Sequence, residues 1–236
     1  MLVTGRSPWI QVAGVHDADE AVLLAACGVT HVGIPLRLAV HAEDIDDREA
    51  AAIVRSLAGV AVPVLVTYLD RAAEVEDLCR RLGVSTVQIH GDIEAGELMR
   101  LRESALQLTV VKSLVVRPGA LEALETVARA TAPFVDAFIT DTWDPVTGAT
   151  GATGRVHDWS ISRALVARAA RPVILAGGLT PDNVGAAIRS VRPAGVDAHT
   201  GLEDASGRKS RSLVERFVAE ARAAFAETAT DPSPRV

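Results

Sequence analysis

The sequence predicts a single α/β domain folded as a (β/α)8 TIM barrel, and three observations lead to this prediction. Short apolar runs alternate with amphipathic segments about eight times along the chain. The connections between them are short, as expected when each helix returns the chain to the next parallel strand. Hydrophobic residues make up 49% of the 236 residues and aromatic residues only 3%, which is typical of aliphatic strands buried on both faces.

The expected elements alternate along the whole chain. Apolar, β-branched runs predict the strands Trp9–Ala13, His31–Pro35, Val62–Tyr68, Val84–His90, Leu108–Ser113, Phe134–Thr140, Pro172–Ala176 and Gly195–Ala198. Helical periodicity predicts the helices Asp17–Cys27, Asp46–Leu57, Arg71–Leu82, Glu94–Arg102, Gly119–Ala130, Ser160–Ala170, Pro181–Val191 and Ser210–Ala226. The barrel domain therefore spans residues 1–226, and the polar residues 227–236 are expected to form a flexible C-terminal tail.

The overall composition limits the classes of partner. The formal net charge of −6 argues against nucleic acid and against an anionic membrane surface. Cys27 and Cys79 fall in expected helices and resemble small buried residues more than a disulfide pair. We recognise no signal sequence and no apolar run of about 18 residues, so the expected location is cytoplasmic. No cofactor is expected.

The segment Val173–Val184 carries the features of a phosphate-binding turn. An apolar strand stops at Gly177 and Gly178, and a helix start with Thr180 as N-cap is expected immediately afterwards. The two glycines lack the Cβ atoms that would keep an oxyanion away from backbone N–H groups. The pattern predicts that this turn binds phosphate through its backbone.

A second glycine turn follows one unit later, at Asp197–Gly201. Thr200 and Gly201 are the residues of this turn expected to contact phosphate. The last two units of a (β/α)8 barrel are where such folds hold phosphate groups. The two turns together predict a phosphorylated small molecule as the substrate.

The long connection Asp141–Asp158, rich in glycine and threonine, follows the sixth expected strand. Loops of this length in a compact domain are more often functional than idle, so we expect a lid over the mouth of the barrel. Asp141 stands at the C-terminal end of its strand, which is where barrel enzymes carry catalytic groups.

Several motifs together resemble the phosphoribosylanthranilate isomerase family of tryptophan biosynthesis. In chain order they are Val87–Gly91, Val111–Lys112, Phe138–Thr142, Gly151–Trp159, Leu175–Val184 and Gly195–Glu203. The resemblance covers roughly residues 9–226 and implies a (β/α)8 barrel that performs an Amadori rearrangement of a ribosylamine phosphate. Such chemistry needs an acid to open the furanose ring and a base to take the proton from C2.

The catalytic pair of the family is only half present. The family's base is a cysteine in a Lys-Ile-Cys-Gly segment, and this chain has Gln11, Val12, Ala13 and Gly14 there. The methyl group of Ala13 cannot accept a proton. The family's acid is an aspartate at the end of the sixth strand, and the resemblance assigns that role to Asp141.

A second departure follows the second strand. The family carries a Ser-Pro-Arg segment there, whose arginine pairs with the anthranilate carboxylate. One alignment places His41, Ala42 and Glu43 opposite it, which would reverse the charge, and a gapped alignment brings Arg37 into that role. Two changes at the anthranilate end, beside a kept phosphate end, suggest an altered substrate.

Two histidines are candidates to replace the missing base. His90 ends the fourth strand and His16 follows the first, and unperturbed imidazole titrates near pH 6.5. His199 is expected near the phosphate rather than in proton transfer. Together with His41 these residues lack the spacing of metal-ligand motifs, so no metal site is expected.

Two cations are candidates for substrate binding. Lys112 on the fifth strand is expected to face the mouth, because burying an unpaired ammonium group is costly. Arg155 on the lid keeps the positive charge that a lysine supplies in the family. We therefore expect an acid–base aldose–ketose isomerase, as a monomer or homodimer; the alternatives are a lyase or aldolase that uses Lys112 and a non-catalytic paralogue that binds a phosphorylated ligand.

Overall fold

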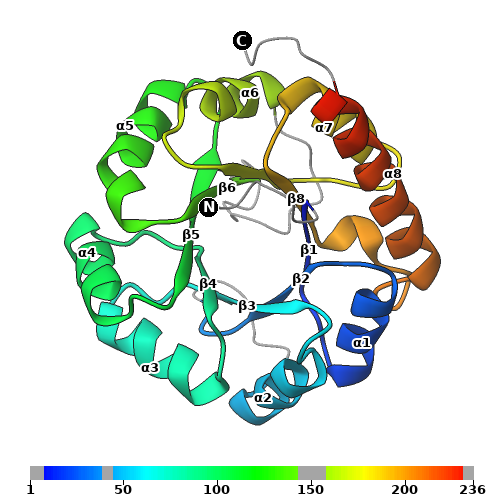
Figure 1. Cartoon of the computed structure of the whole chain (residues 1–236), viewed down its shortest axis with the longest axis horizontal. Coiled ribbons are helices and arrows are strands. Elements are labelled where there is room, and N and C mark those ends of the chain that lie inside the picture. Colours follow the sequence, from blue (N-terminus) through cyan, green and yellow to red (C-terminus); the bar gives the residue numbers. More distant parts are fainter. Residues whose placement is uncertain (1–7, 39–44, 143–157, 231–236) are drawn as a thin grey trace.

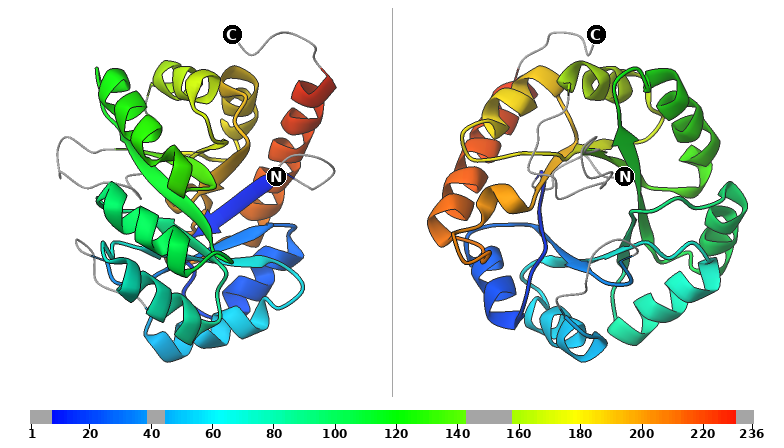
Figure 2. Two further views of the ribbon diagram at one scale, coloured as in Figure 1. Left: turned by 60° about the vertical axis from the view of Figure 1, so that its left-hand side comes forward. Right: turned by 180° about the vertical axis from the view of Figure 1, so that it is seen from behind.

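The computed structural model describes residues 8–38, 45–142 and 158–230 of the chain. In these segments parallel strands are neighbours in sequence order, and β8 also pairs with β1, so that the sheet closes into a barrel. Figure 1 shows the helices as a ring around the strands, and Figure 2 shows the same ring from behind. The predicted (β/α)8 TIM barrel is confirmed.

The elements have the following bounds. The strands are β1 Trp9–Ala13, β2 His31–Pro35, β3 Val62–Thr67, β4 Thr86–Ile89, β5 Thr109–Val116, β6 Ala137–Thr142, β7 Val173–Leu175 and β8 Gly195–Ala198. The helices are α1 Ala18–Ala26, α2 Asp47–Ser56, α3 Ala72–Leu82, α4 Ala95–Ser104, α5 Leu121–Thr131, α6 Trp159–Arg168, α7 Val184–Val191 and α8 Arg211–Thr230. Two short 3-10 turns are η1 Ala132–Phe134 and η2 Thr200–Leu202.

Two apolar layers hold the barrel together. The larger lies between strands and helices and contains the fully buried Phe138 and Phe217. The smaller fills the inside of the barrel and consists of Trp9, Val64, Val66, Val111, Ala137, Ile139, Ile174 and Ala176. Successive strand residues point to opposite faces, so residues in phase with the inner layer face the barrel axis. This alternation decides which polar side chains reach the mouth.

The start of α7 differs from the expectation. The helix begins at Val184 rather than Pro181, and Pro181 to Asn183 form a turn. The Asn183 side chain accepts a hydrogen bond from Thr180 N at 2.8 Å and donates to Gly178 O at 2.9 Å. These bonds satisfy the turn locally and postpone the helix by three residues.

Strand bounds agree best where no side chain competes with the ladder. β1, β2 and β8 have the expected bounds. β7 is shorter than expected, because Ala176 N donates to the side chain of Thr140 on the neighbouring β6 and not to a backbone carbonyl group. β6 begins later than expected, because Phe134 ends the η1 turn.

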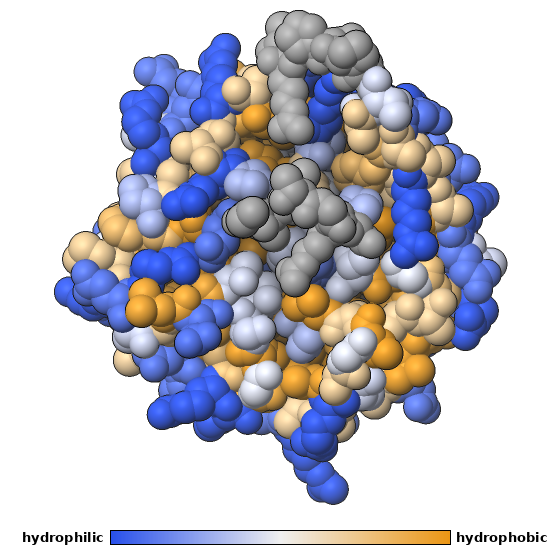
Figure 3. Space-filling view, in the orientation of Figure 1, coloured by the Kyte–Doolittle hydropathy of each residue, from blue (hydrophilic) through white to orange (hydrophobic). Residues whose placement is uncertain are grey.

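Helix α8 is longer than the expected helix and ends at Thr230, so residues 227–230 of the expected tail are helical. Among the described residues, no helix is both long and apolar enough to span a membrane. Figure 3 shows hydrophilic and apolar side chains interspersed on one face of the molecule. The exposed large apolar residues are spread over separate elements, for example Val22 on α1, Met99 on α4 and Val127 on α5.

Candidate active site

A carboxylate–imidazole pair lies at the C-terminal ends of β4 and β6. Asp141 shares the inward phase of Ala137 and Ile139 on β6, and His90 directly follows β4. His90 Nε2 lies 2.9 Å from Asp141 Oδ2, and about a tenth of each side chain is exposed. The structure therefore brings together two residues that the sequence singled out separately.

Neighbouring groups fix the orientation of this pair. Asp141 Oδ1 accepts a hydrogen bond from Thr142 N at 2.7 Å. His90 Nδ1 lies 3.3 Å from Ser113 Oγ and 3.4 Å from Gln88 Nε2, and Tyr68 packs edge-on against the ring. A carboxyl group held against an imidazole in this way can hold a proton and deliver it.

Below the pair lies a layer of buried polar side chains that span the barrel. Gln11 Nε2 donates to Gln88 Oε1 at 2.9 Å, and Trp9 Nε1 donates to Gln11 Oε1 at 3.1 Å. The layer positions Gln88, whose amide group lies against His90. The family that the sequence resembles has a lysine at the position of Gln11, so this chain has a neutral amide group there in place of a cation.

Asp197 on β8 belongs to the same layer and was not singled out from the sequence. Its Cα is in register with that of Gln11 on β1, and among the described residues its buried Oδ1 has no hydrogen-bond partner. Burial and the charge of Asp141 raise the pKa of Asp197 to about 8, so that this carboxyl group is mainly protonated at neutral pH. Its inward phase on β8, two residues before His199, is the sequence signal that could have identified it.

Ala13 ends β1 in phase with Trp9 and Gln11, at the mouth of the barrel. The space beside it is narrow, because a Cβ built on Gly33 of β2 would lie 2.8 Å from the Cβ of Ala13. In the family, the cysteine that acts as the base stands at this position. In this chain the position holds the small apolar side chain of Ala13, close to Gly33 of β2.

The glycine turns after β7 and β8 touch each other. Gly177 and Gly178 have φ values of 106° and 62°, which side chains with a Cβ rarely adopt. A Cβ on Gly201 would lie 2.2 Å from Leu179 O, so only glycine fits there. Thr200 and Gly201 form the start of η2. The contact of these residues with phosphate remains a prediction. A shared phosphate site requires the two turns to lie together, and they do.

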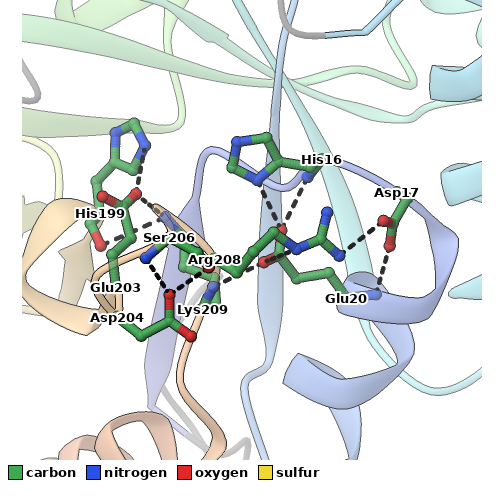
Figure 4. A network of polar contacts seen from close by, with 9 residues as sticks. All are labelled: His16, Asp17, Glu20, His199, Glu203, Asp204, Ser206, Arg208 and Lys209. Carbon is green, nitrogen blue, oxygen red and sulfur yellow. Dashed lines mark hydrogen bonds and ion pairs between the residues drawn. The ribbon is translucent and has the colours of Figure 1, made fainter.

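His16 and His199 lie at opposite ends of one charged network, drawn in Figure 4. Glu20, which is buried, accepts from the backbone and ring of His16 at 2.9 and 3.1 Å and from Lys209 N at 2.7 Å. Lys209 Nζ in turn pairs with Glu203 Oε1 at 2.6 Å, and this same oxygen lies 3.4 Å from His199 Nε2. The network joins the loops after β1 and β8.

Lys112 differs from the expectation that it faces the mouth. It lies between the inward-facing Val111 and Ser113 on β5, so its side chain leaves from the outer face of the strand. Its Nζ donates to Gly91 O at 2.9 Å and Ser113 O at 2.8 Å, and burial lowers the pKa of the ammonium group to about 8. A lysine directed away from the barrel axis gives no support to the lyase alternative.

Of the two arginines expected to contact the substrate, Arg37 lies in the described part of the chain and Arg155 does not. Arg37, with φ 59°, forms two hydrogen bonds to the carboxylate of Asp47 on α2, at 2.7 and 2.9 Å. Arg155 lies outside the described residues, as do His41 and Glu43. The alignment of Arg37 with the family's carboxylate-binding arginine therefore stays a prediction.

The fold and this mouth define an enzyme of the (β/α)8-barrel class. The family model of N-(5'-phosphoribosyl)anthranilate isomerase matches residues 11–220. The chain belongs to this isomerase family, whose members carry out an aldose–ketose isomerisation.

Individual relatives agree with the family assignment. N-(5'-phosphoribosyl)anthranilate isomerase 2 of Methanosarcina mazei is 42% identical over 221 residues, which cover 92% of this chain and 95% of the relative. The Haloferax volcanii isomerase is 39% identical over 91% of this chain and 93% of the relative. The solved phosphoribosylanthranilate isomerase of Thermotoga maritima superposes with a TM-score of 0.77 at 24% identity, over 92% of this chain and 100% of that one.

Proposed function

We propose that the protein isomerises a phosphorylated ribosylamine to the corresponding 1-amino-1-deoxyketose, and that the amine part of its substrate differs from anthranilate. The observation that carries the reaction class is the 2.9 Å pair of His90 and Asp141 at the strand ends, in the same mouth as the glycine turns. The pair supplies acid–base chemistry, and the turns at Gly177 and Gly201 supply a site for the phosphate.

The proton transfers can be assigned in outline. Asp141 delivers a proton to the ring oxygen and opens the furanose, which leaves a protonated imine at C1. His90 lies 2.9 Å from the same carboxyl group and holds it in position. It can also pass a proton from the surrounding water to Asp141 and so restore the acid. Because Asp141 faces the barrel axis, it can reach a substrate whose phosphate is held between the ends of β7 and β8.

The altered substrate is supported by the change at Ala13. A family member that keeps its acid but lacks its thiol works with a rearranged site, and a rearranged site fits a changed substrate. The relatives at 42% and 39% identity carry the name of phosphoribosylanthranilate isomerase, so phosphoribosylanthranilate is the first compound to test.

The test is a direct assay with phosphoribosylanthranilate, followed through its loss of fluorescence, in parallel with rescue of a tryptophan auxotroph. We expect turnover at least about 10²-fold below that of an authentic isomerase measured alongside, and faster turnover of another N-(5-phosphoribosyl)amine. A rate equal to that of the authentic enzyme would reject the altered substrate and leave the isomerase assignment standing.

Binding can be measured without turnover. A solved phosphoribosyl anthranilate isomerase holds reduced 1-(o-carboxyphenylamino)-1-deoxyribulose 5-phosphate, and this stable compound is a suitable probe. We expect inorganic phosphate to compete with it for the turns at Gly178 and Gly201. If inorganic phosphate does not weaken the binding of this compound, the proposed phosphate site is wrong.

A further inference from the structure

His199 lies directly over Gly14, the residue that follows Ala13. Its Nε2 is 1.9 Å from the position that a Cβ on Gly14 would occupy, and its two ring carbons next to Nε2 are 2.5 and 2.6 Å from it. A glycine with φ 76° at position 14 leaves the room that the ring occupies. The imidazole of the β8 loop therefore rests on the end of β1, beside the position of the family's cysteine.

One carboxylate lies close enough to the His199 ring to orient it. Glu203 Oε1 lies 3.4 Å from Nε2, and the fully buried Lys209 ammonium holds this carboxylate in place at 2.6 Å. A base oriented by a carboxylate is the arrangement that general-base catalysis needs, because the carboxylate stabilises the imidazolium once it has formed. About a third of the His199 side chain remains exposed, so a ligand can reach it.

Within residues 8–38, 45–142 and 158–230, two further histidines lie at the mouth, and each contacts other groups. His90 contacts Asp141 through Nε2 and lies beside Ser113 and Gln88 through Nδ1. His16 is bound through its ring and its backbone to Glu20. Of the three histidines described at the mouth, His199 is the one whose ring lies against Gly14, the residue after Ala13.

We propose that His199 is the general base that replaces the missing thiolate and takes the proton from C2 of the substrate. The inference rests on the proposed isomerisation and names a residue for its second half. It differs from the expectation drawn from the sequence, in which His199 lies near the phosphate rather than in proton transfer and the base is His16 or His90.

The step balances within the site. After ring opening, the C2–H bond breaks and the proton passes to the neutral imidazole of His199. The electron pair of that bond forms the C1=C2 bond, and the C1=N electrons move to the imine nitrogen, which becomes neutral. The imidazolium then returns its proton to C1, and the C2 hydroxyl releases its own proton to the surrounding water, which replaces the proton that Asp141 gave to the ring oxygen. These two transfers yield the ketone and regenerate both the base and the acid.

Electrostatics favour the neutral form of the base before the substrate binds. Burial, with smaller contributions from Lys209 and His16, lowers the pKa of His199 to about 3. A phosphate group held at the neighbouring Thr200 and Gly201 brings negative charge close to the ring and raises this pKa. The base therefore becomes stronger as the phosphorylated substrate binds.

Affinity labelling tests the assignment without depending on the natural substrate. A phosphorylated bromoketone binds through its phosphate and alkylates the nucleophilic side chain beside its carbonyl carbon. We expect peptide mapping by mass spectrometry to find the label on His199, with labelling suppressed by inorganic phosphate. A label found on His16, His90 or Asp141 and absent from His199 would overturn the proposal.

A rescue experiment separates a base from a merely structural ring. His199→Ala should lower kcat by about 10²–10⁴-fold with little change in phosphate affinity or thermal midpoint. Adding Ala13→Cys to this variant should restore activity by more than about tenfold, because a thiolate then stands at the end of β1. Ala13→Ser in the same background is the matched control and should restore nothing.

The outcomes of the two proposals can be distinguished. If His199→Ala keeps the wild-type kcat, or if Ser restores activity as well as Cys does, His199 is not the base and the isomerase assignment is unaffected. If the wild type turns over no phosphoribosylamine, the proposed function fails, and the labelling result still decides whether His199 is the nucleophilic group beside the phosphate.

Discussion

The chemical groups at the mouth of the barrel are those side chains that point from the strands toward the barrel axis. Asp141 and His90 were expected from their positions at strand ends, and they form one hydrogen-bonded pair. The register of Asp197 with Gln11 and the contact of His199 with Gly14 became visible only once β8 was placed beside β1. At the scale of residues, the positions of Asp141 and His90 were predictable and the groups around Ala13 were not.

Asp141 allows a prediction that separates binding from chemistry. Asp141→Asn should lower turnover of the substrate by at least about 10²-fold, because an amide of the same shape cannot deliver a proton. Phosphate affinity should hardly change, since the glycine turns lie on other strands. The measurement is kcat beside phosphate affinity and thermal midpoint. Lost stability with an unchanged rate per folded molecule would instead make Asp141 a structural residue.

The segment between β7 and α7 shows how one side chain shapes an element. Thr180 and Pro181 form a good helix start in the sequence, yet α7 begins at Val184. The Asn183 amide group bridges Thr180 N and Gly178 O and so ties the phosphate turn to the helix. The late start of α7 is therefore caused by the hydrogen bonds within the glycine turn, and not by a low helix propensity of these residues.

Asn183→Ala tests this role. Removing both hydrogen bonds should lower the free energy of unfolding by about 1–2 kcal/mol and weaken phosphate binding, because Gly178 loses its support. The adjacent Asp182→Ala is the matched control. It breaks only the exposed ion pair with Arg216 and should cost less than about 1 kcal/mol. Urea unfolding and calorimetric phosphate titration measure both effects; equal effects of the two substitutions would contradict the bracing role.

At the scale of the whole molecule, closure of the barrel joins charges on α1 and on the segment between η2 and α8 in one network. Glu20, Glu203 and Lys209 are joined only because the first and last units are neighbours. The same closure buries Asp197 beside Asp141, with no compensating cation at Gln11. Burial of a carboxyl group in this way makes the stability of the fold depend on pH.

The sign of this dependence follows from the raised pKa of Asp197. The folded protein keeps the proton up to about pH 8, whereas the unfolded chain releases it near pH 4. The unfolding free energy contributed by Asp197 therefore falls as pH rises from about 4 to about 8, by up to roughly 1.4 kcal/mol per pH unit. Asp197→Asn should remove this slope and make the variant more stable than the wild type at pH 8.

Chemical unfolding of both proteins at pH 5, 6, 7 and 8 measures the difference between them. The difference isolates Asp197, because His31 and His199, whose pKa values burial lowers to about 3, are present in both proteins. A difference that stays constant over this range would show that Asp197 is ionised in the folded state.

The order of elements, the barrel and the family were determined by the sequence alone. Short apolar runs, helical periodicity and glycine turns are local signals, and the bounds of β1, β2 and β8 follow from them directly. The positions of His90 and Asp141 at the mouth could be predicted for the same reason, since the end of a strand is recognisable from the local sequence.

Only the tertiary structure decided what surrounds the missing cysteine. His199 comes to rest on Gly14 because closure brings residues about 185 positions apart together, and no local pattern encodes that contact. The outward direction of Lys112 and the raised pKa of Asp197 likewise depend on strand phase and on the neighbours across the barrel. The physical reason is that burial and charge are properties of the packed interior, where the free energy of each ionisable group is set by partners far away in the sequence.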